Sequence, residues 1–158
     1  MESRSRFLEY LITNSMADHL EIESRTGKLS CSSSEIFSFI TDIRNFEQFI
    51  PKKSLQNWRA SCDECSFQVP PFNKSAIRIT EKIPYSSVVF SGNALMKDDF
   101  SLTTSISENA SGCAEVKLLM TIEINPVFRK MVEEPLKSVL EKLISEMEKF
   151  ENWNVKSI

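Results

Sequence analysis

The chain has 158 residues and a formal net charge of −3 at pH 7, which fits one domain and offers no basic block for nucleic acid. Hydrophobic residues make up 41% and charged residues 26%, as in ordinary globular proteins, and three glycines leave little material for a phosphate-binding loop. No apolar run approaches the roughly 18 residues that span a membrane. Because the N-terminus also lacks a signal-peptide cleavage site, we expect a cytoplasmic protein.

The chain divides into three expected segments. Residues 1–17 form an N-terminal extension, either disordered or a short helix, in which Glu9 interrupts a short apolar stretch. Residues 18–152 form the folded domain, and residues 153–158 form a C-terminal tail. The four cysteines are expected to be reduced thiols, as is usual in the cytoplasm.

The first third of the domain predicts a strand followed by two short helices. Polar and apolar residues roughly alternate over 20–31, with a break possible at Gly27. Serines at 32–34 then precede apolar residues at helical spacing up to Ile43, and serine is a good helix N-cap. A second short helix is predicted over 45–50, ending before Pro51.

The middle of the domain changes to the two-residue period of half-buried strands. Residues 61–65 are predicted to form a hairpin turn, and the asparagine and glycine at 109–112 signal another turn. Such strands suit an antiparallel sheet with one face in water. The predicted strands are 55–60, 66–69, 77–83, 86–92, 100–107 and 113–124.

The C-terminal part predicts one long helix over 126–150, with Pro126 near its first position. Its apolar residues fall on one stripe, and Pro135 is expected to bend the helix. We expect the stripe to cover the sheet, with Val132, Leu136, Val139 and Leu143 buried. The stripe consists of Phe128, Val132, Leu136, Val139, Leu140, Leu143, Met147 and Phe150.

This order of elements resembles the helix-grip fold of the START/SRPBCC superfamily, which includes polyketide cyclases and the birch-pollen-allergen proteins. The resemblance spans about residues 18–150 and is strongest to small uncharacterised bacterial SRPBCC proteins. It implies an α+β fold in which a curved, antiparallel, seven-stranded sheet wraps around the C-terminal helix, with two short helices after the first strand. The stretches that carry it are 23–29, 34–37, 42–46 with Pro51, 57–58, 64–67, 124–126 and 134–136.

The resemblance implies a hydrophobic cavity between the sheet and the long helix, which members use for lipids, polyketides, sterols, quinones or hormones, while other members bind proteins. It carries no catalytic motif onto this chain, and we expect no metal and no cofactor. The residues predicted to line the cavity are Phe67, Ile77, Ile79, Glu81, Phe90, Phe100, Leu102, Leu118, Met120, Val132, Leu136, Val139 and Leu143. Such a set is also typical of a plain core.

Few polar residues are candidates for chemistry. Alternation along the predicted strand places the Glu81 side chain on the cavity side of the sheet. Its position near the end of that strand, before Pro84, instead favours exposure to solvent. His19 is the only histidine, and a triad or a histidine-rich metal site needs more partners. Cys62 and Cys65 have C-x-x-C spacing in a hairpin with acidic residues between them, which favours an ordinary turn over a redox or metal pair.

Three functions remain open from the sequence. The first is binding of an unidentified apolar or amphipathic small molecule in the cavity. The second is a protein-interaction module whose cavity has collapsed. The third is a cyclase- or dehydratase-like enzyme, which is the weakest because nearly all predicted inward positions are apolar, and acid–base catalysis needs positioned titratable groups.

Overall fold

The computed structural model describes residues 19–49, 56–68, 74–93 and 100–153. It has one antiparallel sheet with strand order β1-β8-β7-β6-β5-β4-β3, and the short β2 continues alongside β8 after β1. The strands are β1 (His19–Glu23), β2 (Gly27–Lys28), β3 (Gln56–Ala60), β4 (Glu64–Gln68), β5 (Lys74–Ile83), β6 (Ser87–Asn93), β7 (Phe100–Glu108) and β8 (Ala114–Glu123). The expected α+β architecture of seven main strands and a long C-terminal helix is therefore confirmed.

The helices lie where the serine and proline signals place them. α2 (Ser33–Ile40) begins at a capping box in which the Ser32 hydroxyl accepts from the amide of Glu35. The second short helix is a 3-10 helix, η1 (Ile43–Phe49), rather than an α-helix. At the C-terminus η2 (Pro126–Phe128) precedes α3 (Arg129–Lys149), so the predicted long helix begins with a tighter turn.

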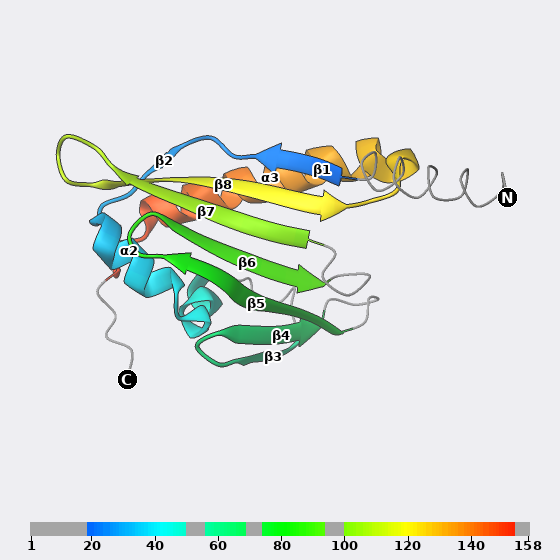
Figure 1. Cartoon of the computed structure of the whole chain (residues 1–158), viewed down its shortest axis with the longest axis horizontal. Coiled ribbons are helices and arrows are strands. Elements are labelled where there is room, and N and C mark those ends of the chain that lie inside the picture. The colour runs from blue at the N-terminus through cyan, green and yellow to red at the C-terminus, as the bar shows by residue number, and fades with distance from the viewer. Residues whose placement is uncertain (1–18, 50–55, 69–73, 94–99, 154–158) are drawn as a thin grey trace, which may run out of the picture.

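The sheet is a meander from β3 to β8, and β1 closes the far edge by pairing with β8 (Figure 1). α3 packs along β1, β2 and β8, while α2 packs against β6, β7 and β8. The long helix thus covers one side of the sheet's inner face. No helix in the described ranges is both long and apolar enough to cross a membrane.

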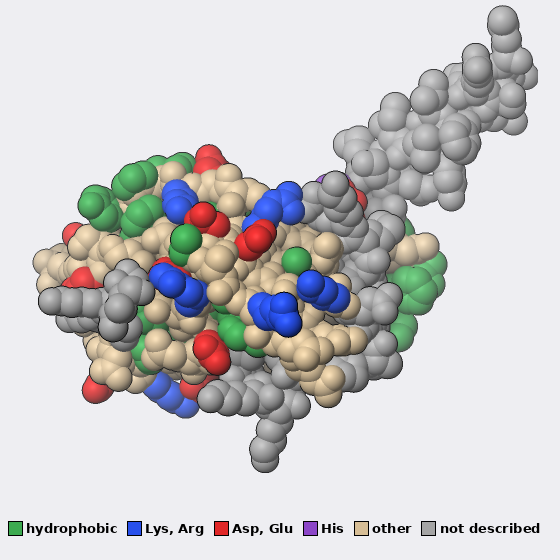
Figure 2. Space-filling model, turned by 90° about the horizontal axis from the view of Figure 1, so that it is seen from below, with side chains coloured by type: hydrophobic (Ala, Val, Ile, Leu, Met, Phe, Trp, Pro, Cys, Tyr) green, Lys and Arg blue, Asp and Glu red, His purple; other side chains and the backbone are tan. Residues whose placement is uncertain are grey.

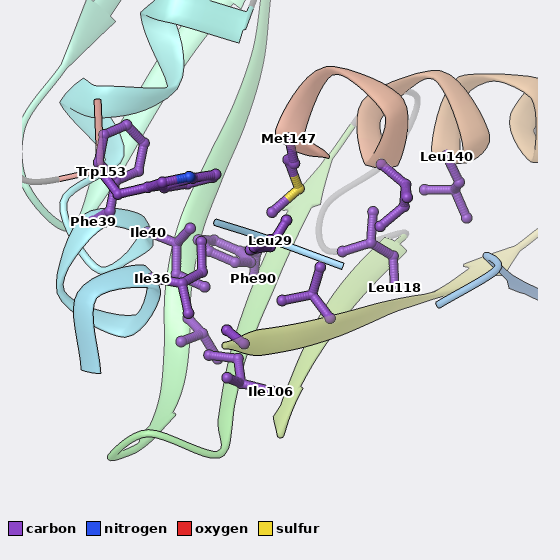
Figure 3. Close-up of a cluster of buried hydrophobic side chains, with 14 of the residues drawn as sticks. Leu29, Ile36, Phe39, Ile40, Phe90, Ile106, Leu118, Leu140, Met147 and Trp153 are labelled. Atoms are coloured by element: carbon purple, nitrogen blue, oxygen red, sulfur yellow. The ribbon is translucent and has the colours of Figure 1, made fainter. Parts of the chain in front are cut away.

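The core lies where the C-terminal half of α3 and α2 meet the sheet. Figure 3 shows Leu140 and Met147 reaching from α3 toward Leu29 and Leu118. The core ends at an aromatic cluster in which the ring of Trp153 lies 4.9 Å from that of Phe39, measured between centroids. The remaining cluster members are Phe49 and Phe150.

Two details of the predicted elements need correction. The break in the first strand spans residues 24–26, before Gly27, because the Ser24 hydroxyl accepts from the amide of Leu118 and interrupts the ladder. The turn predicted at 61–65 is shorter, since Glu64 and Cys65 already belong to β4. The N-terminal extension and nearly all of the C-terminal tail lie outside the described residues.

Candidate functional site

α3 has two unlike flanks on either side of its buried line. The polar flank holds the β1–β2 connection: the Arg25 guanidinium donates to the Glu148 carboxylate at 2.7 Å and to the Ser145 hydroxyl at 3.0 Å. The Arg25 amide donates to Glu141, and the Lys28 amide donates to Glu148. These bonds fix α3 against one edge of the sheet.

The opposite flank of α3 is apolar. At 3.6 residues per turn, Val132, Leu136, Val139 and Leu143 lie on the side of the helix away from Glu141. Val132, Leu136 and Leu143 are half-buried, and Val139 is 56% exposed. The expectation that all four are buried is therefore wrong for Val139 and only partly met for the others. This flank keeps apolar surface in contact with solvent.

The sheet carries apolar side chains in rows that cross its strands. One row follows the register Ile22–Met120–Leu102–Phe90–Ile79. The next follows Leu20–Ile122–Phe100–Gly92–Ile77–Cys65. Among the described residues these two rows contain no charged side chain. A molecule lying on them would meet hydrocarbon and aromatic surface.

The side chains of the two apolar rows are buried at some positions and partly exposed at others. Phe90 is buried, and the ring of Phe46 from η1 lies 5.4 Å from its ring. Leu102, Met120 and Ile122 remain only partly buried. The inner face of the sheet therefore has a sealed part beneath α2 and an incompletely covered part beside the apolar flank of α3.

Comparison with solved structures finds the same architecture in other proteins. An uncharacterised protein from Bacillus thuringiensis matches with a TM-score of 0.63 and 11% identity, over 83% of this chain and 96% of its own. XoxI from Bacillus cereus matches equally well, with 10% identity over 83% and 93%. The di-domain ARO/CYC protein StfQ of the steffimycin biosynthetic pathway has a TM-score of 0.64 and 10% identity, over 87% of this chain and 52% of its own.

The chain has an SRPBCC-like helix-grip fold. At these identities the likeness establishes the fold alone. Neither the known protein families nor the curated proteins contain a match to the sequence. The function has to be argued from the residues on the helix-grip sheet and helix.

Most residues predicted to line the helix-grip cavity lie on the incompletely covered face. Phe90 and Leu118 are instead buried in the core, while Val139 is largely exposed. The half-buried ones are Phe67, Ile77, Ile79, Phe100, Leu102, Met120, Val132, Leu136 and Leu143. Whether they bind a ligand stays a prediction.

Glu81 does not follow the strand phase that would point it inward. The β5–β6 register shifts between Ile79 and Glu81, so that Ile79 pairs with Phe90 but Glu81 pairs with Val89. One extra residue at a β-bulge turns the following side chains to the opposite face. Glu81 is therefore exposed on the outer face, as its alternative placement in solvent anticipated.

Two aromatic residues of this face were missed by the sequence reasoning. Trp58 is half-buried and stacks on Phe67 with ring centroids 6.3 Å apart, and Phe46 covers Phe90. β3 has an irregular register between Gln56 and Arg59, so alternation could not assign Trp58 to a face. The only signals in the sequence were the large aromatic side chain of Trp58 and its place within the predicted strand 55–60.

The remaining titratable candidates are His19, Cys62 and Cys65, of which Cys65 lies at the end of the second apolar row. His19 Nε2 lies 3.7 Å from Glu123 Oε1 at the exposed ends of β1 and β8. Cys62 is exposed in the turn, whereas Cys65 is buried in β4, and burial raises the pKa of the Cys65 thiol to about 11. A raised pKa disfavours the thiolate that redox exchange and metal binding require.

Proposed function

We propose that the protein binds a small apolar or amphipathic molecule between the apolar flank of α3 and the two apolar rows of the sheet. The supporting observation is that apolar side chains from both elements, including Leu136 and Leu102, remain only partly buried on the inner face. A ligand that covered them would gain about 25 cal/mol for each Å² of apolar surface removed from water.

The chemistry of these rows favours an uncharged contact region on the ligand. A carboxylate or phosphate placed there would lose its hydration without meeting a charged partner. The same absence of charged groups among the described row residues favours binding over a cyclase-type reaction, because proton transfer needs a titratable group in reach of the substrate. StfQ is described as an ARO/CYC protein, and that activity is not proposed for this chain.

The proposal is tested with an environment-sensitive apolar dye and by native mass spectrometry of the purified protein. We expect saturable binding of about one equivalent with micromolar affinity, equivalent to roughly 8 kcal/mol. Val139→Trp on the apolar flank and Leu102→Trp in the row should each weaken binding roughly tenfold or more. Ser138→Trp, on an exposed part of the same helix, is the matched control and should leave binding unchanged.

Two outcomes contradict the proposal. Binding that is equally strong in both tryptophan variants would place the dye elsewhere on the protein. Absence of binding to the wild type would show that the face is closed, and would favour the protein-interaction alternative. Such an interaction would use the exposed apolar side chains of Val127 and Phe128 in η2 and of Met131 in α3, which are between 50% and 78% exposed.

A further inference from the structure

The outer face of the sheet has a hollow at the edge that is formed by β3, β4 and β5. Its volume is about 420 Å³, within the range of small-molecule sites. Figure 2 shows the molecule from the side of that edge, where Lys and Arg side chains lie among acidic and uncharged ones. The lining residues of this β3–β5 hollow are Arg59, Ala60, Ser61, Glu64, Cys65, Ser66, Lys74 and Ala76.

Small side chains create the depth of the β3–β5 hollow. Ser66 pairs with Ala76 in the β4–β5 register and with Arg59 in the β3–β4 register. Side chains directly opposite on neighbouring strands share one face and stand close together. A row of serine and alanine therefore leaves space above the strands, and the longer Arg59 and Lys74 side chains rise beside it.

A local irregularity of β3 sets the position of Arg59. The register shifts between Gln56 and Arg59, and Asn57 has a φ of 56°, in the left-handed region. The Asn57 side-chain amide donates to Gln68 Oε1 at 3.1 Å, which ties this conformation to β4. Bulges and strained residues often re-aim a neighbouring side chain next to a binding site.

The donors around the hollow are uncommitted. In the part of the chain that the structure describes, the side chains of Arg59 and Lys74 form no ion pair and no hydrogen bond. Glu64 contributes one carboxylate to the lining, and Arg78 stands directly opposite it in the β4–β5 register. The surroundings thus combine a planar guanidinium, an ammonium and the Ser66 hydroxyl with a single acidic group.

We propose that the β3–β5 hollow binds a small phosphorylated molecule. The Arg59 guanidinium can donate two parallel hydrogen bonds to a phosphoryl group, and the Lys74 ammonium supplies a second positive charge. The Ser66 hydroxyl adds a neutral donor at the floor. This site lies on the outer face of the sheet, opposite the proposed apolar site, and does not depend on it.

The test uses the full chain, labelled with ¹⁵N, and inorganic pyrophosphate as the probe at constant ionic strength. We expect saturable shifts of amide signals in residues 59–66 and 74–76. Arg59→Gln and Lys74→Gln should each weaken binding roughly fivefold, and Glu64→Gln should strengthen it roughly twofold, because the repelling charge is removed. Lys142→Gln, an exposed lysine on α3, is the charge-matched control and should change nothing.

A shape-specific variant separates a site from diffuse attraction. Ala76→Leu keeps every charge but fills the floor of the hollow, so it should also weaken binding roughly fivefold while the other amide signals stay in place. Pyrophosphate affinity that is unchanged in Ala76→Leu, or reduced equally by Lys142→Gln, would overturn the proposal. So would the absence of saturable shifts in the wild type.

Discussion

The two halves of α3 behave differently although they belong to one continuous helix. In the C-terminal half Leu140, Ile144 and Met147 are at most 5% exposed. In the N-terminal half the stripe residues Val132 and Leu136 are only half-buried, and Val139, near the middle, is 56% exposed. Helical periodicity alone would assign apolar residues of both halves to the core. The comparison shows that burial on this helix is decided by what stands opposite it.

The C-terminal half of α3 makes three kinds of close contact with other parts of the chain. Gly27 of β2 has no side chain, so Ile144 can approach the backbone there: a Cβ at Gly27 would lie 2.8 Å from Ile144 Cγ2. Arg25 holds Glu148, and the rings of Phe150 and Trp153 close the end at a centroid distance of 4.8 Å. In the N-terminal half Lys137 donates to the backbone carbonyl of Glu23 on the polar flank, but the opposite, apolar flank stays incompletely covered, and this is the face we propose for binding.

The largest expected difference between the halves is in stability. Ile144→Ala removes a fully buried side chain and should lower the free energy of unfolding by about 2–5 kcal/mol. Val139→Ala, five residues earlier, should cost less than about 0.5 kcal/mol because its side chain is already largely in water. Chemical denaturation of both variants measures the contrast.

Equal losses in Ile144→Ala and Val139→Ala would contradict this division of α3. A large loss for Val139→Ala alone would mean that the apolar flank is packed in solution, and it would count against an open binding face. If a bound ligand stabilises the wild type and Val139→Ala against unfolding by the same amount, the contrast between the two halves of α3 still stands.

The close approach at Gly27 gives a smaller but more specific effect. Gly27→Ala places a methyl group against Ile144 and should destabilise the protein by about 1–3 kcal/mol through overpacking. In the double variant with Ile144→Ala the added methyl occupies space that the truncation opens, so the combined loss should be smaller than the sum of the two. Additive losses, measured by the same denaturation experiment, would show that the two groups do not touch.

Much of the fold could be predicted because the long strands are regular. β8 alternates from Ala114 to Ile122 with only Leu119 out of pattern, and its predicted limits of 113–124 differ from the observed strand by one residue at each end. Ser32 and Pro126 likewise mark helix starts by local chemistry that depends little on the rest of the chain. Periodicity and capping are properties of a few neighbouring residues, so sequence reveals them.

The candidate site was less predictable because it depends on irregularities and on distant partners. A single bulge at residue 80 reverses the side-chain phase after Ile79, and this moved Glu81 to the outer face. Ile144, absent from the predicted stripe, proves to be fully buried because Gly27 lies 117 positions away in sequence yet adjacent in space. Neither the bulge nor this contact leaves a signal in the pattern of nearby residues.

The smallest expected effect concerns the charged contact that holds the C-terminal half of α3. The hydrogen bond from the Arg25 side chain, followed by that from the Lys28 amide, lowers the pKa of Glu148 below its ordinary range. A carboxyl group with a lowered pKa in the folded state stabilises the fold above its unfolded pKa, roughly 4.3, and loses that contribution as the pH falls through its folded pKa.

Glu148→Gln removes the charge but keeps the shape of the side chain, so its effect should depend on pH. We expect the Tm of the variant to lie below that of the wild type at pH 7, and the two values to converge as the pH falls from the unfolded pKa, roughly 4.3, through the lower pKa of the folded wild-type carboxylate. The difference should be modest and should shrink with added salt, because the contact is partly exposed. Glu146→Gln is the control: it lies two residues earlier, its Oε1 is 3.9 Å from Lys149 Nζ, and it should show no such convergence. A Tm difference for Glu148→Gln that is constant from pH 3 to pH 8 would mean that the carboxylate acts through packing alone, and that the charge of Arg25 does not help to hold α3 in place.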